Sequence, residues 1–95
     1  MSEMLNKAVT GVARAQVEAR VLDLSLGGAL LQAAAAFEVG TISDFAVPLD
    51  AGSIWVQAEV KRCTPANGGY DVGLEFVGMH PQDQRRLVEY LARPR

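Results

Sequence analysis

The stretch Asp23-Leu24-Ser25-Leu26-Gly27-Gly28 separates two apolar segments and decides how we expect the chain to fold. Residues 17–22 before it alternate apolar and charged side chains, which is typical of a β-strand with one buried face. Since residues two apart in a strand share a face, Asp23 and Ser25 are predicted to continue the row of Val21 as polar groups. Gly27 and Gly28 have no Cβ, so the backbone there is expected to turn and to approach another group closely.

Two interpretations of this small hydrogen-bonding surface stay open. Asp and Ser are common turn residues, and Asp23 and Ser25 can cap their own turn by bonding nearby amides. The same carboxylate and hydroxyl, followed by bare backbone, can instead bind a ligand. Local chemistry does not separate the two.

The composition favours one small domain that binds rather than catalyses. The chain has 95 residues, 49% of them hydrophobic, so we expect residues 1–95 to form a single domain with a modest core. A net charge of −2 offers no basic field for nucleic acid. The single cysteine, Cys63, excludes an internal disulfide and a cysteine-rich metal site. No paired carboxylates, Ser-His-Asp set, phosphate loop or metal-ligand spacing occurs, so we expect no catalytic residue, metal or cofactor.

The location expected from the sequence is cytoplasmic. No apolar run approaches the roughly 20 residues of a membrane span, so membrane insertion is not expected. Residues 1–4 do not resemble the start of a signal peptide.

Short strands are predicted along most of the chain. Residues 54–61 alternate most clearly, and Asn67-Gly68-Gly69 predicts a hairpin because Asn and Gly tolerate positive φ. Short strands joined by tight turns favour a small antiparallel barrel or sandwich. We expect strands at 7–10 (before a turn at Gly11), 17–22, 29–31, 41–49, 54–61 and 70–76, with a helical turn or loop at 33–36.

The last segment changes its period and predicts a helix. His80-Pro81-Gln82-Asp83 is typical of a helix start, with Pro in the first turn and an acidic side chain near the positive end of the helix dipole. One apolar stripe is expected to pack on the sheet, and it contains Leu87, Val88, Tyr90 and Leu91. Trp55, on the polar face of its strand, is expected to pack under this helix, with a partner surface as the alternative.

Four motifs in this order resemble the PilZ domain family, over about residues 17–91. The first is Asp-x-Ser-x-x-Gly, formed by Asp23, Ser25 and Gly28. The others are Phe37-Glu38-Val39-Gly40, Ala58-Glu59-Val60-Lys61-Arg62 and Tyr70-Asp71-Val72-Gly73-Leu74-Glu75-Phe76.

The resemblance implies a six-stranded antiparallel β-barrel with a C-terminal α-helix, and a ligand, cyclic di-GMP, on the outside of the barrel. It implies that Asp23, Ser25, Gly27 and Gly28 bind the guanine edges. The family grips the phosphates with an Arg-x-x-x-Arg segment upstream of this motif, and no such spacing occurs in this chain. Arg14 is the candidate phosphate contact, whereas Arg20 is out of phase with Asp23 and is predicted to point to the other face.

Two functions follow from the resemblance. The first is a cyclic di-GMP receptor or adaptor that presents a surface to a protein partner. The second is a PilZ-like domain that does not bind the messenger and acts through protein–protein contact, as in type IV pilus assembly or motility.

Overall fold

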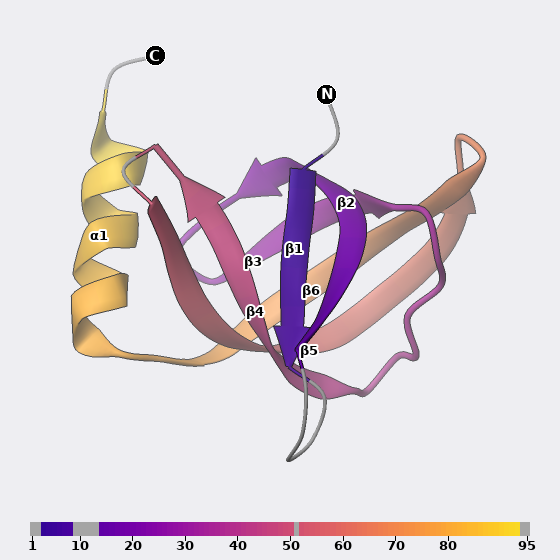
Figure 1. The fold of residues 1–95 in the computed structure, drawn as a ribbon, viewed down its shortest axis with the longest axis horizontal. Helices are drawn as coiled ribbons and strands as arrows, with labels where there is room; N and C mark the ends of the chain where they lie inside the picture. Colours follow the sequence, from indigo (N-terminus) through magenta and orange to yellow (C-terminus); the bar gives the residue numbers. More distant parts are fainter. Residues whose placement is uncertain (1–2, 9–13, 51, 94–95) are drawn as a thin grey trace.

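An antiparallel sheet followed by one helix makes up the described part of the chain (Figure 1). The structure is a computed structural model that describes residues 3–8, 14–50 and 52–93, with side chains from Ala19 onward. Its elements are β1 (Glu3–Ala8), β2 (Arg14–Leu24), β3 (Gly28–Ala33), β4 (Ile42–Leu49), β5 (Gly52–Ala66), β6 (Gly69–Met79) and α1 (Pro81–Ala92).

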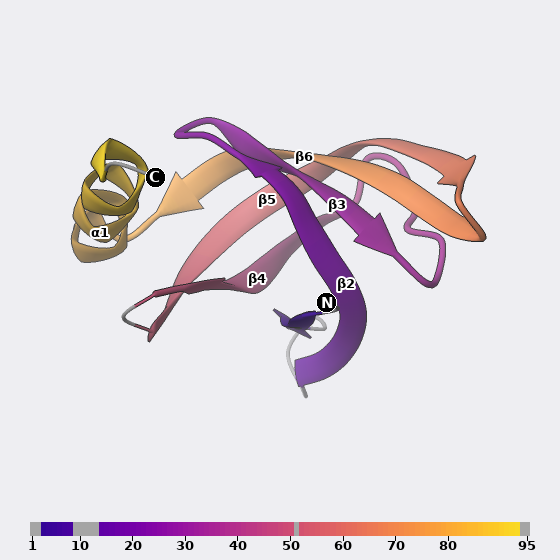
Figure 2. The same ribbon diagram turned by 90° about the horizontal axis from the view of Figure 1, so that it is seen from above.

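The sheet curls into a half-barrel. Strands β2, β3, β6, β5 and β4 pair in that order, each antiparallel to its neighbour. β1 lies between β2 and β4 in the second view (Figure 2). The prediction of a mainly β domain with a C-terminal helix is confirmed.

The core lies on the concave face of the sheet and follows the alternation seen in the sequence. Ile54, Val56, Ala58 and Val60 of β5 are each at most 1% exposed, as their period of two predicted. Phe45 of β4 is fully buried. Its ring stacks on that of Phe37, with centroids 6.2 Å apart. Apolar burial on one face therefore holds the curled sheet together.

The sequence predicted the turn between β5 and β6 correctly, whereas for residues 33–36 it left a helical turn and a loop as alternatives. Ala66 pairs with Gly69, so Asn67 and Gly68 alone form the predicted hairpin turn, with φ of 53° and 79°. By contrast, the run 33–36 contains no helical turn. Ala33 ends β3 opposite Ala19, and this pairing holds it in extended backbone. Residues 34–36 are a loop, which is the second of the two predicted alternatives.

Other strand boundaries also shift. β5 runs five residues beyond the predicted end at Lys61, so Cys63 lies within the strand and packs against the core. The first two residues of the predicted strand 7–10 are the last two residues of β1. The remainder of that prediction, Val9, Thr10 and the turn at Gly11, falls outside the described residues.

The helix begins and packs much as its sequence predicts. His80 is the N-cap, and its Nδ1 accepts a hydrogen bond from the backbone N–H of Gln82 at 3.1 Å. Leu87 is fully buried and Leu91 packs against the core, whereas Val88 is 45% exposed. The predicted stripe was therefore too wide by one residue. In the described part of the chain, no helix is long and apolar enough to cross a membrane.

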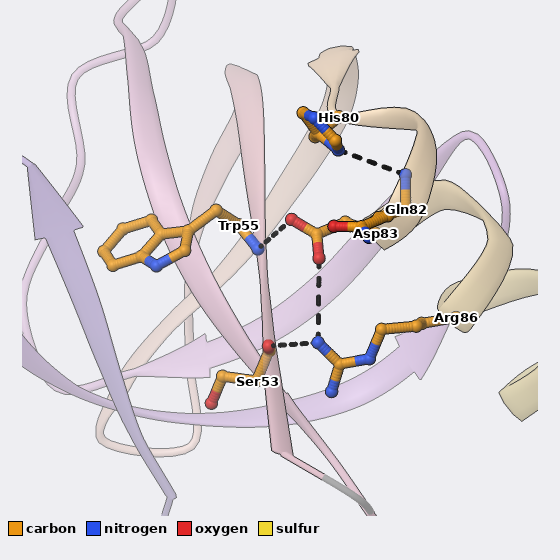
Figure 3. A network of polar contacts seen from close by, with 6 residues as sticks. All are labelled: Ser53, Trp55, His80, Gln82, Asp83 and Arg86. Carbon is orange, nitrogen blue, oxygen red and sulfur yellow. Dashed lines mark hydrogen bonds and ion pairs between the residues drawn. The ribbon is translucent and has the colours of Figure 1, made fainter.

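Polar contacts also fix α1 to β5 (Figure 3). Asp83 accepts a hydrogen bond from the backbone N–H of Trp55 at 3.3 Å and pairs with Arg86 at 3.6 Å. Arg86 in turn donates to the carbonyl of Ser53 at 3.0 Å. These contacts join residues about thirty positions apart, so they set where the helix sits on the sheet.

Candidate functional site

A register shift in β2 determines which way Asp23 faces. Val21 pairs with Leu31 of β3, but Asp23 pairs with Leu30, so Leu22 is an extra residue in β2. One extra residue reverses the alternation of faces beyond it. Val21 therefore packs against the core, while Asp23 lies exposed on the outer, convex face. The prediction that Asp23 continues the row of Val21 is wrong for this reason.

The same shift corrects the prediction for Arg20. Arg20 pairs with Gln32, which is on the outer face of β3, between the buried Leu31 and Ala33. Arg20 and Asp23 therefore share the outer face instead of pointing in opposite directions. A basic and an acidic side chain lie on the same exposed surface at this end of β2.

The turn from Asp23 to Gly28 bonds mainly to itself. Asp23 Oδ1 accepts from the adjacent N–H of Leu24 at 3.0 Å. Ser25 Oγ accepts from the N–H of Gly27 and donates to the carbonyl of Gly28, each at 3.3 Å. These are the contacts of the turn-capping interpretation. Asp23 and Ser25 both stay exposed, so the capping contacts leave the two side chains accessible.

Gly27 and Gly28 differ in how much space a side chain would have at each position. A Cβ on Gly28 would lie 2.2 Å from the carbonyl oxygen of Leu74, because β3 and β6 approach closely there. A Cβ on Gly27 would meet nothing within 4 Å. Neither glycine has a positive φ, so the turn itself does not require them. Gly28 therefore makes room for β6, and only Gly27 leaves open space above the turn.

Arg14 does not lie beside Asp23. It opens β2 opposite Ala8, and its side chain lies outside the described residues. Asp23 lies nine residues further along β2, which is about 30 Å of path along the strand at roughly 3.3 Å per residue. The structure brings Asp23, Ser25, Gly27 and Gly28 together and leaves Arg14 at the far end of β2.

A second register shift places Arg62 on the outer face. Val60 pairs with Leu74 and Arg62 with Gly73, so Lys61 is the extra residue of β5. A Cβ built on Gly73 would lie 3.6 Å from Cβ, 3.8 Å from Nε and 4.0 Å from Nη2 of Arg62. The arginine side chain therefore runs over the bare backbone of Gly73.

These pairings form one row across four strands. Asp23 of β2, Leu30 of β3, Gly73 of β6 and Arg62 of β5 are successive partners on the outer face. Sequence analysis missed Arg62 as a site residue. The signal that could have found it is Gly73, a glycine inside a strand, which marks a close approach by another group.

The charges around the row are unevenly paired. Lys61 bridges Glu59 at 3.6 Å and Glu75 at 3.9 Å. Among the described residues, no carboxylate lies within ion-pair distance of Arg62, which is exposed. Asp71, in the neighbouring row, has a buried Oδ1 that finds no hydrogen-bond partner within the described part. Within that part no group of three or more metal-ligating side chains occurs.

Two hollows flank this surface. A polar one of about 250 Å³ lies beyond Arg20 and is lined by Ala19, Arg20, Gln32, Ala33, Ala34, Asn67, Gly68 and Gly69. The other, of about 410 Å³, lies at the start of α1, and the half-buried Trp55 contributes to its wall. Trp55 thus lies beside the helix start, at the edge of an open hollow, instead of being covered by the helix.

Comparison with known proteins agrees with the motifs. A family model described as "PilZ domain" matches residues 6–93. The flagellar brake protein YcgR of Thioalkalivibrio sulfidiphilus (strain HL-EbGR7) is 32% identical over 80 residues, which cover 79% of this chain. The match covers only 32% of that relative, so this chain corresponds to a minor part of its length.

Proposed function

Because the chain belongs to the PilZ domain family, we propose that it is a cyclic di-GMP receptor or adaptor domain of bacterial second-messenger signalling. The messenger docks on Asp23, Ser25 and the backbone of Gly27 and Gly28. Its arrival changes the outer surface that a protein partner contacts. The domain acts in the cytoplasm as a binding module and catalyses no reaction.

The outward position of Asp23 is the observation that carries this proposal. The register shift in β2 moves the carboxylate from the core face to the exposed face. A guanine base offers N–H donors, and a carboxylate is an acceptor with two oxygens. Oδ1 bonds Leu24, and within the described residues no group donates to Oδ2. One acceptor oxygen therefore remains for a base edge.

The ligand surface needs a rigid support, and we infer that a closed six-stranded barrel supplies it. The backbone of β1 pairs with β2 from Glu3 to Ala8, and Asn6 and Lys7 pair with Ala46 and Phe45 of β4. These two ladders favour β1 as the sixth strand, which joins the two edges of the curled sheet.

Arg14 remains the proposed phosphate contact of this site. Its backbone opens β2, about 30 Å of path along the strand from Asp23 at roughly 3.3 Å per residue, and its side chain lies outside the described residues.

A second candidate function is a PilZ domain that acts through protein–protein contact alone, as in type IV pilus assembly or motility. It is favoured by the internal hydrogen bonds of the turn, which need no ligand. It is also favoured by exposed apolar side chains beside the turn. Leu22, Leu26 and Val77 are 43%, 57% and 46% exposed. The backbone links this group, since Phe76 donates to the carbonyl of Gly27.

Calorimetric titration with cyclic di-GMP separates the two candidates. We expect saturable heat at micromolar ligand for the wild-type chain and none for Asp23→Ala, because the base-binding carboxylate is gone. Asp44→Ala is the matched control, since Asp44 is also an exposed strand aspartate, on β4. A wild-type chain that stays silent at high ligand concentration contradicts the receptor proposal and leaves the protein-contact function.

A further inference from the structure

The hollow of about 410 Å³ at the start of α1 is a groove on the outer face of β4, β5 and β6. Strand pairing places its floor, because Asp44 of β4 pairs with Gln57 of β5, and Gln57 pairs with Gly78 of β6. A Cβ built on Gly78 would lie 3.1 Å from Oε1 of Gln57, so the amide side chain lies across this bare position. The groove is therefore separate from the turn at 23–28 and has no function in the proposals above.

Trp55 forms a wall of this groove. Ile54 and Val56, on either side of it, are at most 1% exposed and face the core, so the ring of Trp55 faces outward. Asp83 accepts a hydrogen bond from the backbone N–H of Trp55, and the ring extends away from that carboxylate (Figure 3). The helix start thus fixes the backbone of Trp55 and leaves the ring beside the hollow. Tryptophan at the edge of a groove is typical of a contact surface.

The charge around the groove is negative. Asp44 is exposed, and among the described residues no cation lies within ion-pair distance of it. In the next outward row, Glu59 and Glu75 share one ammonium, that of Lys61. No Lys or Arg side chain of the described part lines the groove. An occupant that carries a positive charge is therefore favoured.

We propose that this groove is a docking site for a protein partner and that it receives an arginine side chain of that partner. The flat guanidinium stacks on the indole of Trp55 as a cation–π contact, and its fork of N–H donors meets the carboxylate of Asp44. The amide oxygen of Gln57 is a further acceptor beside it. The inference rests on the proposed contact with a protein partner, which both candidate functions need, and not on binding of cyclic di-GMP.

Other occupants fit the groove less well. The start of a helix attracts anions, but here the first turn carries Asp83, and the backbone N–H of Gln82 is already bound by His80. An apolar side chain would cover Asp44 without giving it a partner, which is unfavourable for a carboxylate. A cation satisfies the carboxylate and the aromatic wall together.

The test is an NMR titration of the ¹⁵N-labelled 95-residue chain with N-acetyl-arginine amide, and with N-acetyl-citrulline amide as a neutral probe of the same shape. Trp55 is the chain's one tryptophan, so it gives a single indole N–H signal. We expect this signal and the backbone signal of Gly78 to shift and saturate with arginine amide, at a Kd of roughly 1–10 mM for one side chain. Citrulline amide is expected to leave both signals in place.

Variants test which side chains hold the cation. Asp44→Asn is expected to weaken the binding of arginine amide about 2- to 5-fold, the size typical of an exposed ion pair. Trp55→Leu is expected to weaken it by a similar factor, followed at Gly78. Glu89→Gln is the matched control, because it removes one exposed carboxylate of α1 that lines a different hollow, and it keeps the wild-type affinity. The dispersion of each spectrum shows whether the variant is folded.

The outcomes separate this inference from the receptor function. Equal shifts with citrulline amide, saturable shifts with inorganic phosphate in place of arginine amide, or no saturable shift with any probe would each overturn it. Shifts at Trp55 that depend on protein concentration alone would show that a second copy occupies the groove, and would overturn it too. A chain that binds arginine amide but gives no heat with cyclic di-GMP loses the receptor function and keeps this docking site.

Discussion

The contact between α1 and β5 and the turn at 23–28 use similar side chains in opposite ways. At the helix, Asp83 bonds Trp55 and pairs with Arg86, so its partners lie 28 and 3 positions away. At the turn, Asp23 bonds only the next residue, and Ser25 bonds within three positions. The side chain of Asp83 is only 20% exposed, whereas Asp23 is exposed to solvent.

This difference separates structural from functional polar groups. A half-buried carboxylate with long-range partners joins two elements, and its loss removes a hydrogen bond between them. An exposed carboxylate with one local bond joins nothing, so the fold does not depend on it. The mutations below test whether stability depends on the contact between α1 and β5 and only weakly on the exposed side chains of the turn.

The largest expected effect is on stability at the helix. Leu87→Ala removes a fully buried side chain between α1 and the sheet, and we expect a loss of about 2–5 kcal/mol in the free energy of unfolding. Val88→Ala, one position along the same helix but 45% exposed, is expected to change it by less than about 0.5 kcal/mol. Urea denaturation measures both. Equal losses would mean that the helix does not pack through Leu87.

A smaller loss is expected at the turn, and at only one of its glycines. Gly28→Ala forces a Cβ against the backbone of Leu74, so we expect about 1–3 kcal/mol of destabilisation by overpacking. Gly27→Ala meets open space and is expected to stay within about 0.5 kcal/mol of wild type. The same denaturation experiment compares them. A destabilised Gly27→Ala would show that the turn is packed more tightly than the structure indicates.

The smallest stability effect, and the sharpest comparison, comes from the two aspartates. Asp83→Ala is expected to cost about 1–2 kcal/mol, since it removes the hydrogen bond from the backbone N–H of Trp55 and the ion pair with Arg86. Asp23→Ala is expected to cost less than about 0.5 kcal/mol. Trp55 is the chain's one tryptophan, so its fluorescence follows unfolding in both variants. A larger loss at Asp23 than at Asp83 would reverse the assignment of roles.

Much of the fold was predictable because its signals are local. The alternation at 54–60, the Asn67-Gly68 hairpin and the His80-Pro81 helix start each depend on a few neighbouring residues, and each prediction is confirmed. The predicted apolar stripe of the helix included Val88, which is exposed, because the side of a helix that faces the sheet depends on where the helix packs.

The candidate site was less predictable, because its side chains are aimed by strand pairing. The sequence by itself determined that Asp23, Ser25, Gly27 and Gly28 lie together at a strand end, since adjacent residues cannot separate. It also determined which apolar rows form the core. Only the tertiary structure decided that Asp23, Arg20 and Arg62 share the outer face and that Arg14 and Asp23 lie at opposite ends of β2. The physical reason is that a bulge is a mismatch between two strands, so the extra residue exists only relative to its partner strand, and one extra residue reverses every side chain beyond it.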